Sequence, residues 1–238
     1  MAIAPVPLAR IDFEDPTIWA VLIGWVMSVT LHEFAHGLVA WWGGDYTIRE
    51  RGGLTLNPFQ YVDPLMSLVL PVVFLMMGGI PLPGGATYVR RDLLRSRGWN
   101  SAVSAAGPAM NLLLFGLLAI PLMPGFGWIN LSVSPTEWTT AQKFVSSMCF
   151  LQLLSVILNL VPVPPLDGFG IISPYLPDDV RVRLTTPPLS SMLFFGYFLL
   201  LWQAPGFMGM IDNGMQAIMG RELYAVAGGG FFAVFYAR

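Results

Sequence analysis

Apolar residues in this chain are gathered into long stretches rather than alternating with polar ones. The stretches cover about residues 17–42, 64–82, 99–123, 141–161 and 189–202, with a weaker one in the C-terminal tail. At 1.5 Å per helical residue, the first, third and fourth are long enough to cross a hydrocarbon core of about 30 Å. The pattern predicts an all-α polytopic membrane protein, built as a bundle of about five to six transmembrane or re-entrant helices.

The second stretch, 64–82, differs from the others because Pro71 interrupts it and a run of Pro and Gly follows it. Basic residues lie on both of its sides: Arg49, Arg51, Arg90, Arg91, Arg95 and Arg97. Lys and Arg are enriched in cytoplasmic loops, so both flanks are expected in the cytoplasm and the segment is expected to re-enter rather than cross. From residue 99 to 142 there is no Lys or Arg, which places that loop on the opposite side.

The connection after the first stretch contains two short runs, 46–49 and 52–56, with β-branched and aromatic residues separated by turn residues. These predict a short β-hairpin, either a plain connection or an edge onto which an extended peptide could add as a strand. No internal repeat and no second soluble domain is visible. We therefore expect a single membrane domain over residues 1–238.

Composition and charge support a membrane location and argue against nucleic acid. Hydrophobic residues make up 55% of the chain and charged residues 11%, whereas soluble domains carry about 25% charged residues. The net charge is −2 and the basic residues are scattered in short loops, so no nucleic-acid partner is expected. The acidic residues that follow Arg10 are atypical of a cleavable signal peptide, so the first stretch is expected to be retained as structure.

The first apolar stretch contains the sequence His32-Glu33-Phe34-Ala35-His36. Residues four apart share one face of a helix, so both imidazoles can reach one metal ion, with Glu33 beside a metal-bound water as a general base. A catalytic zinc needs a third protein ligand. Asp167 is the strongest candidate, because three prolines break the chain just before it, although it could instead cap that broken helix end. The other acidic residues near apolar segments are Asp45, Asp63, Asp92 and Glu137.

Further motifs add a family resemblance to this local chemistry. Ala106-Gly107-Pro108-Ala109-Met110-Asn111 lies in the third stretch, and Asn159-x-x-Pro162-x-Pro164-Pro165-x-Asp167-Gly168 closes the fourth. Gly53-Leu54-Thr55-Leu56-Asn57-Pro58 and Asp63-Pro64 lie between the first two stretches. Taken with the His32–His36 motif and its order along the chain, these resemble the site-2 protease family of intramembrane zinc metalloproteases, in its compact bacterial form.

The resemblance implies a zinc-dependent endopeptidase that cleaves membrane-spanning or membrane-associated substrates, with one zinc per chain. His32, His36 and Asp167 would be the metal ligands and Glu33 the catalytic base. Asn111 and Asn159 would bind substrate or the developing oxyanion, although interhelical hydrogen bonding is an open alternative for both. A non-catalytic scaffold of the same fold is the alternative function. The distribution of positive charge places the site toward the cytoplasmic side. The compact form that the resemblance indicates points to a bacterial plasma membrane.

Overall fold

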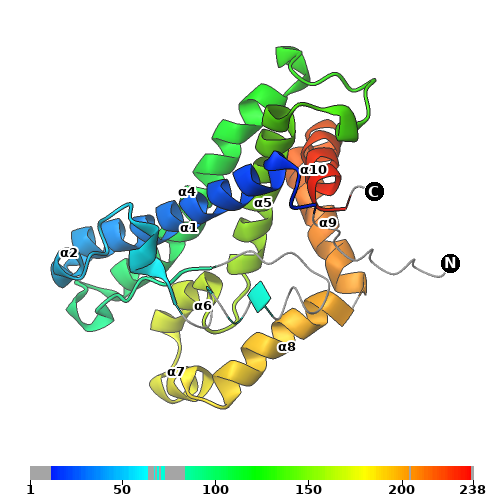
Figure 1. Ribbon diagram of the computed structural model, residues 1–238. Helices are drawn as coiled ribbons and strands as arrows, with labels where there is room; N and C mark the ends of the chain where they lie inside the picture. The colour runs from blue at the N-terminus through cyan, green and yellow to red at the C-terminus, as the bar shows by residue number, and fades with distance from the viewer. Residues whose placement is uncertain are drawn as a thin grey trace.

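The chain folds into helices in the computed structural model, which describes residues 12–63, 67, 69, 71–72, 84–203 and 205–236 (Figure 1). Short 3₁₀ turns link the α-helices, and no strand occurs among these described residues. The α-helices are α1 (Pro16–Gly43), α2 (Thr47–Glu50), α4 (Arg97–Ala119), α5 (Thr140–Asn159), α6 (Asp167–Ile172), α7 (Asp178–Thr185), α8 (Leu189–Gln203), α9 (Pro205–Met219) and α10 (Arg221–Phe235).

Within the part of the chain that the structure describes, three helices are long and apolar enough to cross a membrane: α1, the Arg97–Leu122 helix that contains α4, and α5. They coincide with the first, third and fourth apolar stretches, so the prediction of an all-α membrane protein is confirmed for these elements. The pair α7 and α8 is bent by 65° and would add a fourth span if it crosses as one unit. Helices α9 and α10 have 15 residues each, which corresponds to about 22 Å and is short for a full crossing.

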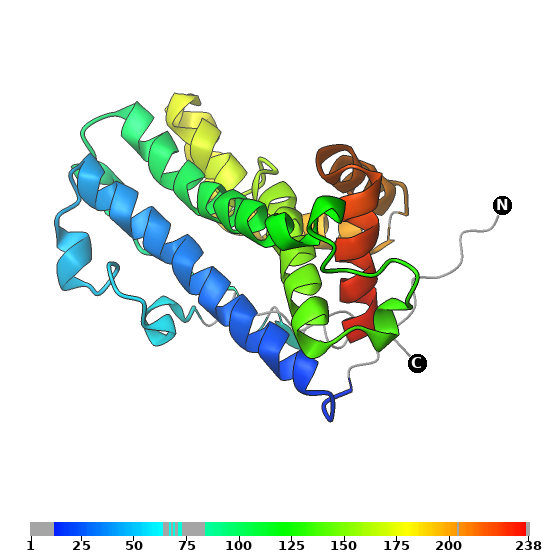
Figure 2. The same ribbon diagram turned by 90° about the horizontal axis from the view of Figure 1, so that it is seen from above.

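The three long helices pack against one another. Figure 2 shows α1 and α4 side by side and running in opposite directions, with α5 crossing them and α10 lying against α5. The apolar core includes the fully buried side chains of Ile18, Val21, Leu151, Leu153 and Phe235. Buried polar residues of α1, α4 and α5 also lie within this packing, and some of them belong to the site described below.

The predicted β-hairpin is wrong. Residues 47–50 form α2, a single helical turn, and 51–54 form turns. The helix ends because Gly52 has a φ of +78°, a left-handed conformation that only glycine adopts readily, and Gly53 N–H donates to the Ile48 carbonyl at 2.9 Å. The Gly-Gly pair is therefore a helix stop. The β-branched Ile48 is buried here on a helix rather than in a strand.

Asp45 holds α2 and the segment after residue 84 against the end of α1. Its fully buried carboxylate accepts hydrogen bonds from Thr47 Oγ1 at 2.5 Å, Arg51 Nη2 at 2.9 Å and the Arg90 N–H at 2.8 Å. Burial raises the pKa of Asp45, but these donors and the Arg51 charge outweigh burial and lower the pKa below its ordinary value. This network holds the chain that leads into α4 against the end of α1.

The predicted re-entrant segment 64–82 lies outside the described residues except for 67, 69 and 71–72. The structure does describe the residues on either side of this segment, and hydrogen bonds join the two sides. The Ala86 N–H donates to the Tyr61 carbonyl at 3.0 Å, and Tyr88 Oη donates to the Asp63 carboxylate at 2.8 Å. Because the two ends of the segment are bonded to each other, they lie on the same side of the bundle. Re-entry itself stays a prediction.

Candidate metal centre

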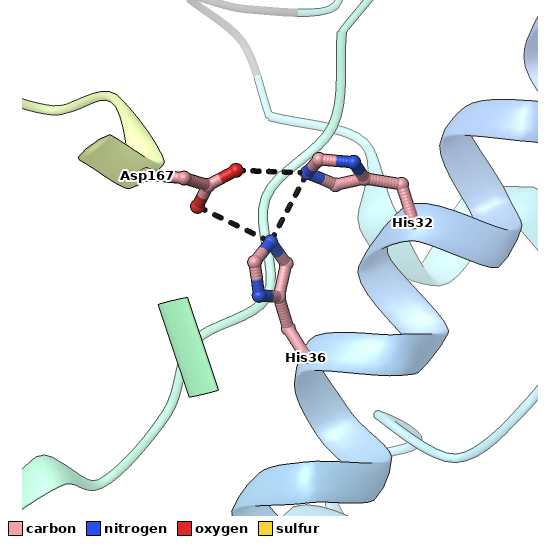
Figure 3. Close-up of side chains that lie close together, drawn as sticks. All are labelled: His32, His36 and Asp167. Atoms are coloured by element: carbon pink, nitrogen blue, oxygen red, sulfur yellow. Dashed lines mark hydrogen bonds and ion pairs between the residues drawn. The ribbon is translucent and has the colours of Figure 1, made fainter. Parts of the chain in front are cut away.

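The side chains of His32, His36 and Asp167 converge on one point. The two Nε2 atoms are 3.1 Å apart, and the Asp167 carboxylate places one oxygen 3.1 Å from His32 Nε2 and the other 3.3 Å from His36 Nε2 (Figure 3). All three side chains are largely buried. Among the described residues, this is the group of His, Cys, Asp and Glu side chains that could hold a metal ion.

The spacing of these donor atoms fits a tetrahedral zinc site. Zinc bonds of 2.0–2.1 Å separate neighbouring ligands of a tetrahedron by about 3.3–3.4 Å. The two imidazole nitrogens are separated by close to that value, and each nitrogen lies at a similar distance from one of the two Asp167 oxygens. The Asp167 carboxylate adds an oxygen donor to the two imidazole nitrogens, a combination that zinc binds in proteins. The residues present therefore fit zinc, which would take a fourth ligand from water or substrate.

The second nitrogen of each imidazole is held by an acceptor from α4. His32 Nδ1 lies 3.1 Å from Asn111 Oδ1, and His36 Nδ1 lies 2.6 Å from the Val103 carbonyl oxygen. Since an amide or carbonyl oxygen only accepts hydrogen bonds, both Nδ1 atoms carry a proton and both Nε2 atoms keep a lone pair for the metal. Helix α4 thus sets the orientation of the two ligands on α1.

The site has room for a metal because Gly107 of α4 has no side chain. A Cβ atom at this position would lie 2.3 Å from His32 Nε2 and 2.4 Å from His36 Nε2. The metal-binding nitrogens therefore face the bare backbone of α4. The Gly107-Pro108 pair occurs in the motif that resembles the site-2 protease family, and the structure gives the glycine a definite steric role.

Asp167 reaches the histidines because of the turn that follows α5. Helix α5 ends at Asn159, the prolines at 162, 164 and 165 prevent its continuation, and α6 begins at Asp167. The chain folds back so closely that a Cβ on Gly168 would lie 2.1 Å from the Leu160 carbonyl oxygen. Only glycine allows this approach. Asp167 is thus directed toward α1, and its two carboxylate oxygens contact the imidazoles of His32 and His36.

Glu33 lies next to His32 on α1 and is 6% exposed. Its backbone carbonyl accepts a hydrogen bond from Thr87 Oγ1 at 3.0 Å, and Gly85 lies against its side chain. Glu33 is not one of the three converging donors. Its role as a catalytic base stays a prediction.

The two asparagines lie in one hydrogen-bond network rather than at an open surface. Asn111 contacts His32 through Oδ1 and donates from Nδ2 to Ser155 Oγ at 2.7 Å, and Asn159 Nδ2 lies 3.2 Å from the same oxygen. Their suggested substrate or oxyanion roles stay predictions. The sequence analysis did not predict that Ser155 and the Val103 carbonyl take part in the site. The signal for Ser155 is a polar residue one helical turn before Asn159 in an apolar helix.

Comparison with known proteins identifies relatives named as zinc metalloproteases. The chain is 41% identical over 168 residues to "Putative zinc metalloprotease Rip2" of Mycolicibacterium smegmatis, covering 69% of this chain and 60% of that protein. It is 37% identical over 185 residues to the protein of the same name from Mycobacterium tuberculosis H37Rv, covering 78% and 67%. It is 33% identical over 182 residues to "Putative zinc metalloprotease YwhC" of Bacillus subtilis, covering 76% and 78%.

The chain spans about three fifths of the length of the Mycolicibacterium relative but more than three quarters of the Bacillus one. No family model matches it, and no solved structure matches it significantly. The identity to the Bacillus protein extends over most of both chains. On that similarity the chain belongs to the site-2 protease family of zinc metalloproteases.

Proposed function

We propose that the chain is a zinc-dependent intramembrane endopeptidase. The observation that carries the proposal is the convergence of two imidazole nitrogens and a carboxylate at 3.1–3.3 Å, inside the contact of helices long and apolar enough to span a membrane. A metal site of this composition is typical of zinc hydrolases. Relatives that bear the name of zinc metalloproteases support the same chemistry.

The residues of the site divide into ligands and a base. Bound zinc would supply Lewis acidity, polarising the scissile carbonyl and lowering the pKa of water. His32, His36 and Asp167 would hold the ion. Glu33 would take a proton from the attacking water and pass it to the nitrogen of the leaving amine, which completes hydrolysis of the peptide bond.

The depth of the site supports a substrate within the membrane. His32 lies eleven residues before Gly43, the last residue of α1, which corresponds to about 16 Å along the helix axis. That is about half of a hydrocarbon core of about 30 Å. A peptide bond at this depth belongs to a membrane-spanning or membrane-associated substrate, and a helical substrate would have to unwind locally to expose it.

We place the site toward the cytoplasmic side of a bacterial plasma membrane. Arg49 and Arg51 follow α1, and Arg91 and Arg97 precede or begin α4, so positive charge gathers at the end of the bundle where α1 ends. His32 and His36, which Asp167 contacts, lie in the half of α1 that is nearer to this end. The positive-inside rule then assigns that end to the cytoplasm.

The test uses Glu33→Gln in purified chain reconstituted into liposomes with a membrane-spanning peptide. Zinc content and peptide cleavage are measured on the same preparation. We expect the variant to keep its zinc and lose cleavage, because the amide cannot act as a base. Glu137→Gln, an exposed carboxylate far from the site, serves as the matched control and should cleave normally. Cleavage by Glu33→Gln at the wild-type rate would remove Glu33 from the mechanism.

A further inference from the structure

A buried hydrogen-bond network connects His32 to the end of α5. Asn111 on α4 lies between His32 and Ser155, and Ser155 on α5 also accepts from Asn159 one turn later. Asn111 is 3% exposed and Ser155 is 9% exposed, so bulk water cannot easily replace these bonds. The network therefore joins α1, α4 and α5 through polar groups at the metal site.

The donor and acceptor of each hydrogen bond matter for metal binding, because the Asn111 amide group can rotate and exchange its oxygen and its NH₂ group. In the observed orientation, Asn111 presents its oxygen to His32 Nδ1 and its NH₂ group to Ser155. In the rotated orientation, the NH₂ group would face His32 Nδ1. His32 Nδ1 would then have to accept, its proton would move to Nε2, and a protonated Nε2 cannot bind a metal.

Ser155 provides the acceptor that keeps Asn111 in the productive orientation. Without Ser155 Oγ, one N–H of Asn111 would be buried without a partner, which destabilises the observed orientation of the amide and favours its rotation. Asn159 donates to the same oxygen and helps to hold it as an acceptor. Asn159 also lies in the last turn of α5, directly before the proline turn that carries Asp167.

We propose that Ser155, together with Asn159, is a positioning residue that fixes Asn111 so that His32 keeps Nε2 free as a metal ligand. This inference rests on the zinc site of the proposed function and extends it to residues on α5 that do not touch the metal. Residues in the outer shell of a metal site typically change metal affinity by 10- to 100-fold when they are removed.

The experiment measures zinc affinity of the purified chain in detergent by competition with a chelator, and the visible absorption of the cobalt-substituted protein. Ser155→Ala should bind zinc 10- to 100-fold more weakly than wild type and should alter the cobalt absorption. Ser155→Thr keeps the hydroxyl and should restore affinity to within about threefold of wild type. Asn159→Ala should weaken binding in the same direction by a smaller factor, and it is the second variant if Ser155→Ala does not fold.

Ser147→Ala is the matched control. Ser147 is a fully buried serine of the same helix whose hydroxyl oxygen has no hydrogen-bond partner, so its loss should leave zinc affinity within twofold of wild type. Zinc affinity of Ser155→Ala equal to that of Ser147→Ala, with unchanged cobalt absorption, would overturn the positioning role. A wild-type chain that binds no zinc would instead contradict the proposed function, so the two failures are distinguishable.

Discussion

Gly107→Ala should remove the metal site while leaving the fold in place. The added Cβ would lie 2.3 Å from His32 Nε2 and 2.4 Å from His36 Nε2, whereas real Cβ contacts are essentially never shorter than 3.0 Å. The imidazoles would therefore have to retreat by about 0.7 Å, the difference between 3.0 and 2.3 Å. Zinc–ligand distances tolerate a deviation of about 0.2 Å. Two of three ligands would be displaced beyond that tolerance, so we expect zinc affinity to fall at least 100-fold, about 2.7 kcal/mol.

The assay is chelator competition on purified protein, with thermal unfolding of the metal-free form measured alongside. Gly116→Ala in the same helix is the control, because a Cβ at Gly116 meets no atom within 4 Å. Alanine favours a helix over glycine by about 1 kcal/mol, so Gly116→Ala should keep its zinc and be as stable as wild type or more so. Zinc affinity in Gly107→Ala within threefold of wild type would refute the proposed close approach of α4 to the two histidines.

Three further predictions concern the third ligand, the Asp45 network and the topology. Asp167→Ala should lose both zinc and cleavage, because a two-histidine site holds zinc poorly; zinc analysis showing one ion per chain in this variant would exclude Asp167 as a ligand. The pKa of Asp45 is lowered in the folded state, so its stabilisation is present above its unfolded pKa of about 3.9 and is lost as pH falls through the folded value. Unfolding temperatures measured from pH 3 to 7 should therefore drop more steeply at the acid end for wild type than for Asp45→Asn, and parallel curves would contradict this. Single cysteines at Asn57 and Ser96, in a chain lacking Cys149, should both be labelled from the cytoplasmic side if 64–82 re-enters; labelling from opposite sides would mean a full crossing.

The part of the site that follows from local sequence could be predicted. The spacing of His32 and His36 fixes their common face because helix periodicity is a local property. The prolines before Asp167 mark a broken helix, and the resemblance to a known family connected that carboxylate with the histidines. The apolar stretches predicted α1, α4 and α5 because length and hydropathy decide whether a helix can span a membrane.

The rest depends on how helices pack, which a single sequence does not reveal. Gly107 is recognisable as part of a motif, but its steric role appears only when α4 lies against α1. Ser155 is recognisable as polar, but its partner comes from another helix. The prediction of a β-hairpin was wrong for a different reason. The Gly52-Gly53 pair ends the helical turn, and the hydrogen bond from Thr47 Oγ1 to Asp45 holds the turn at its start, and together they outweighed the β propensity of Ile48.

The most direct test of the central proposal is the rate of peptide cleavage in liposomes as zinc is returned to metal-free protein. We predict no cleavage without metal, a rate that rises in proportion to added zinc, and saturation at one zinc per chain. Cleavage that persists in the metal-free protein, or a zinc-loaded chain that cleaves no membrane-spanning peptide, would contradict the assignment of His32, His36 and Asp167 to a proteolytic zinc site.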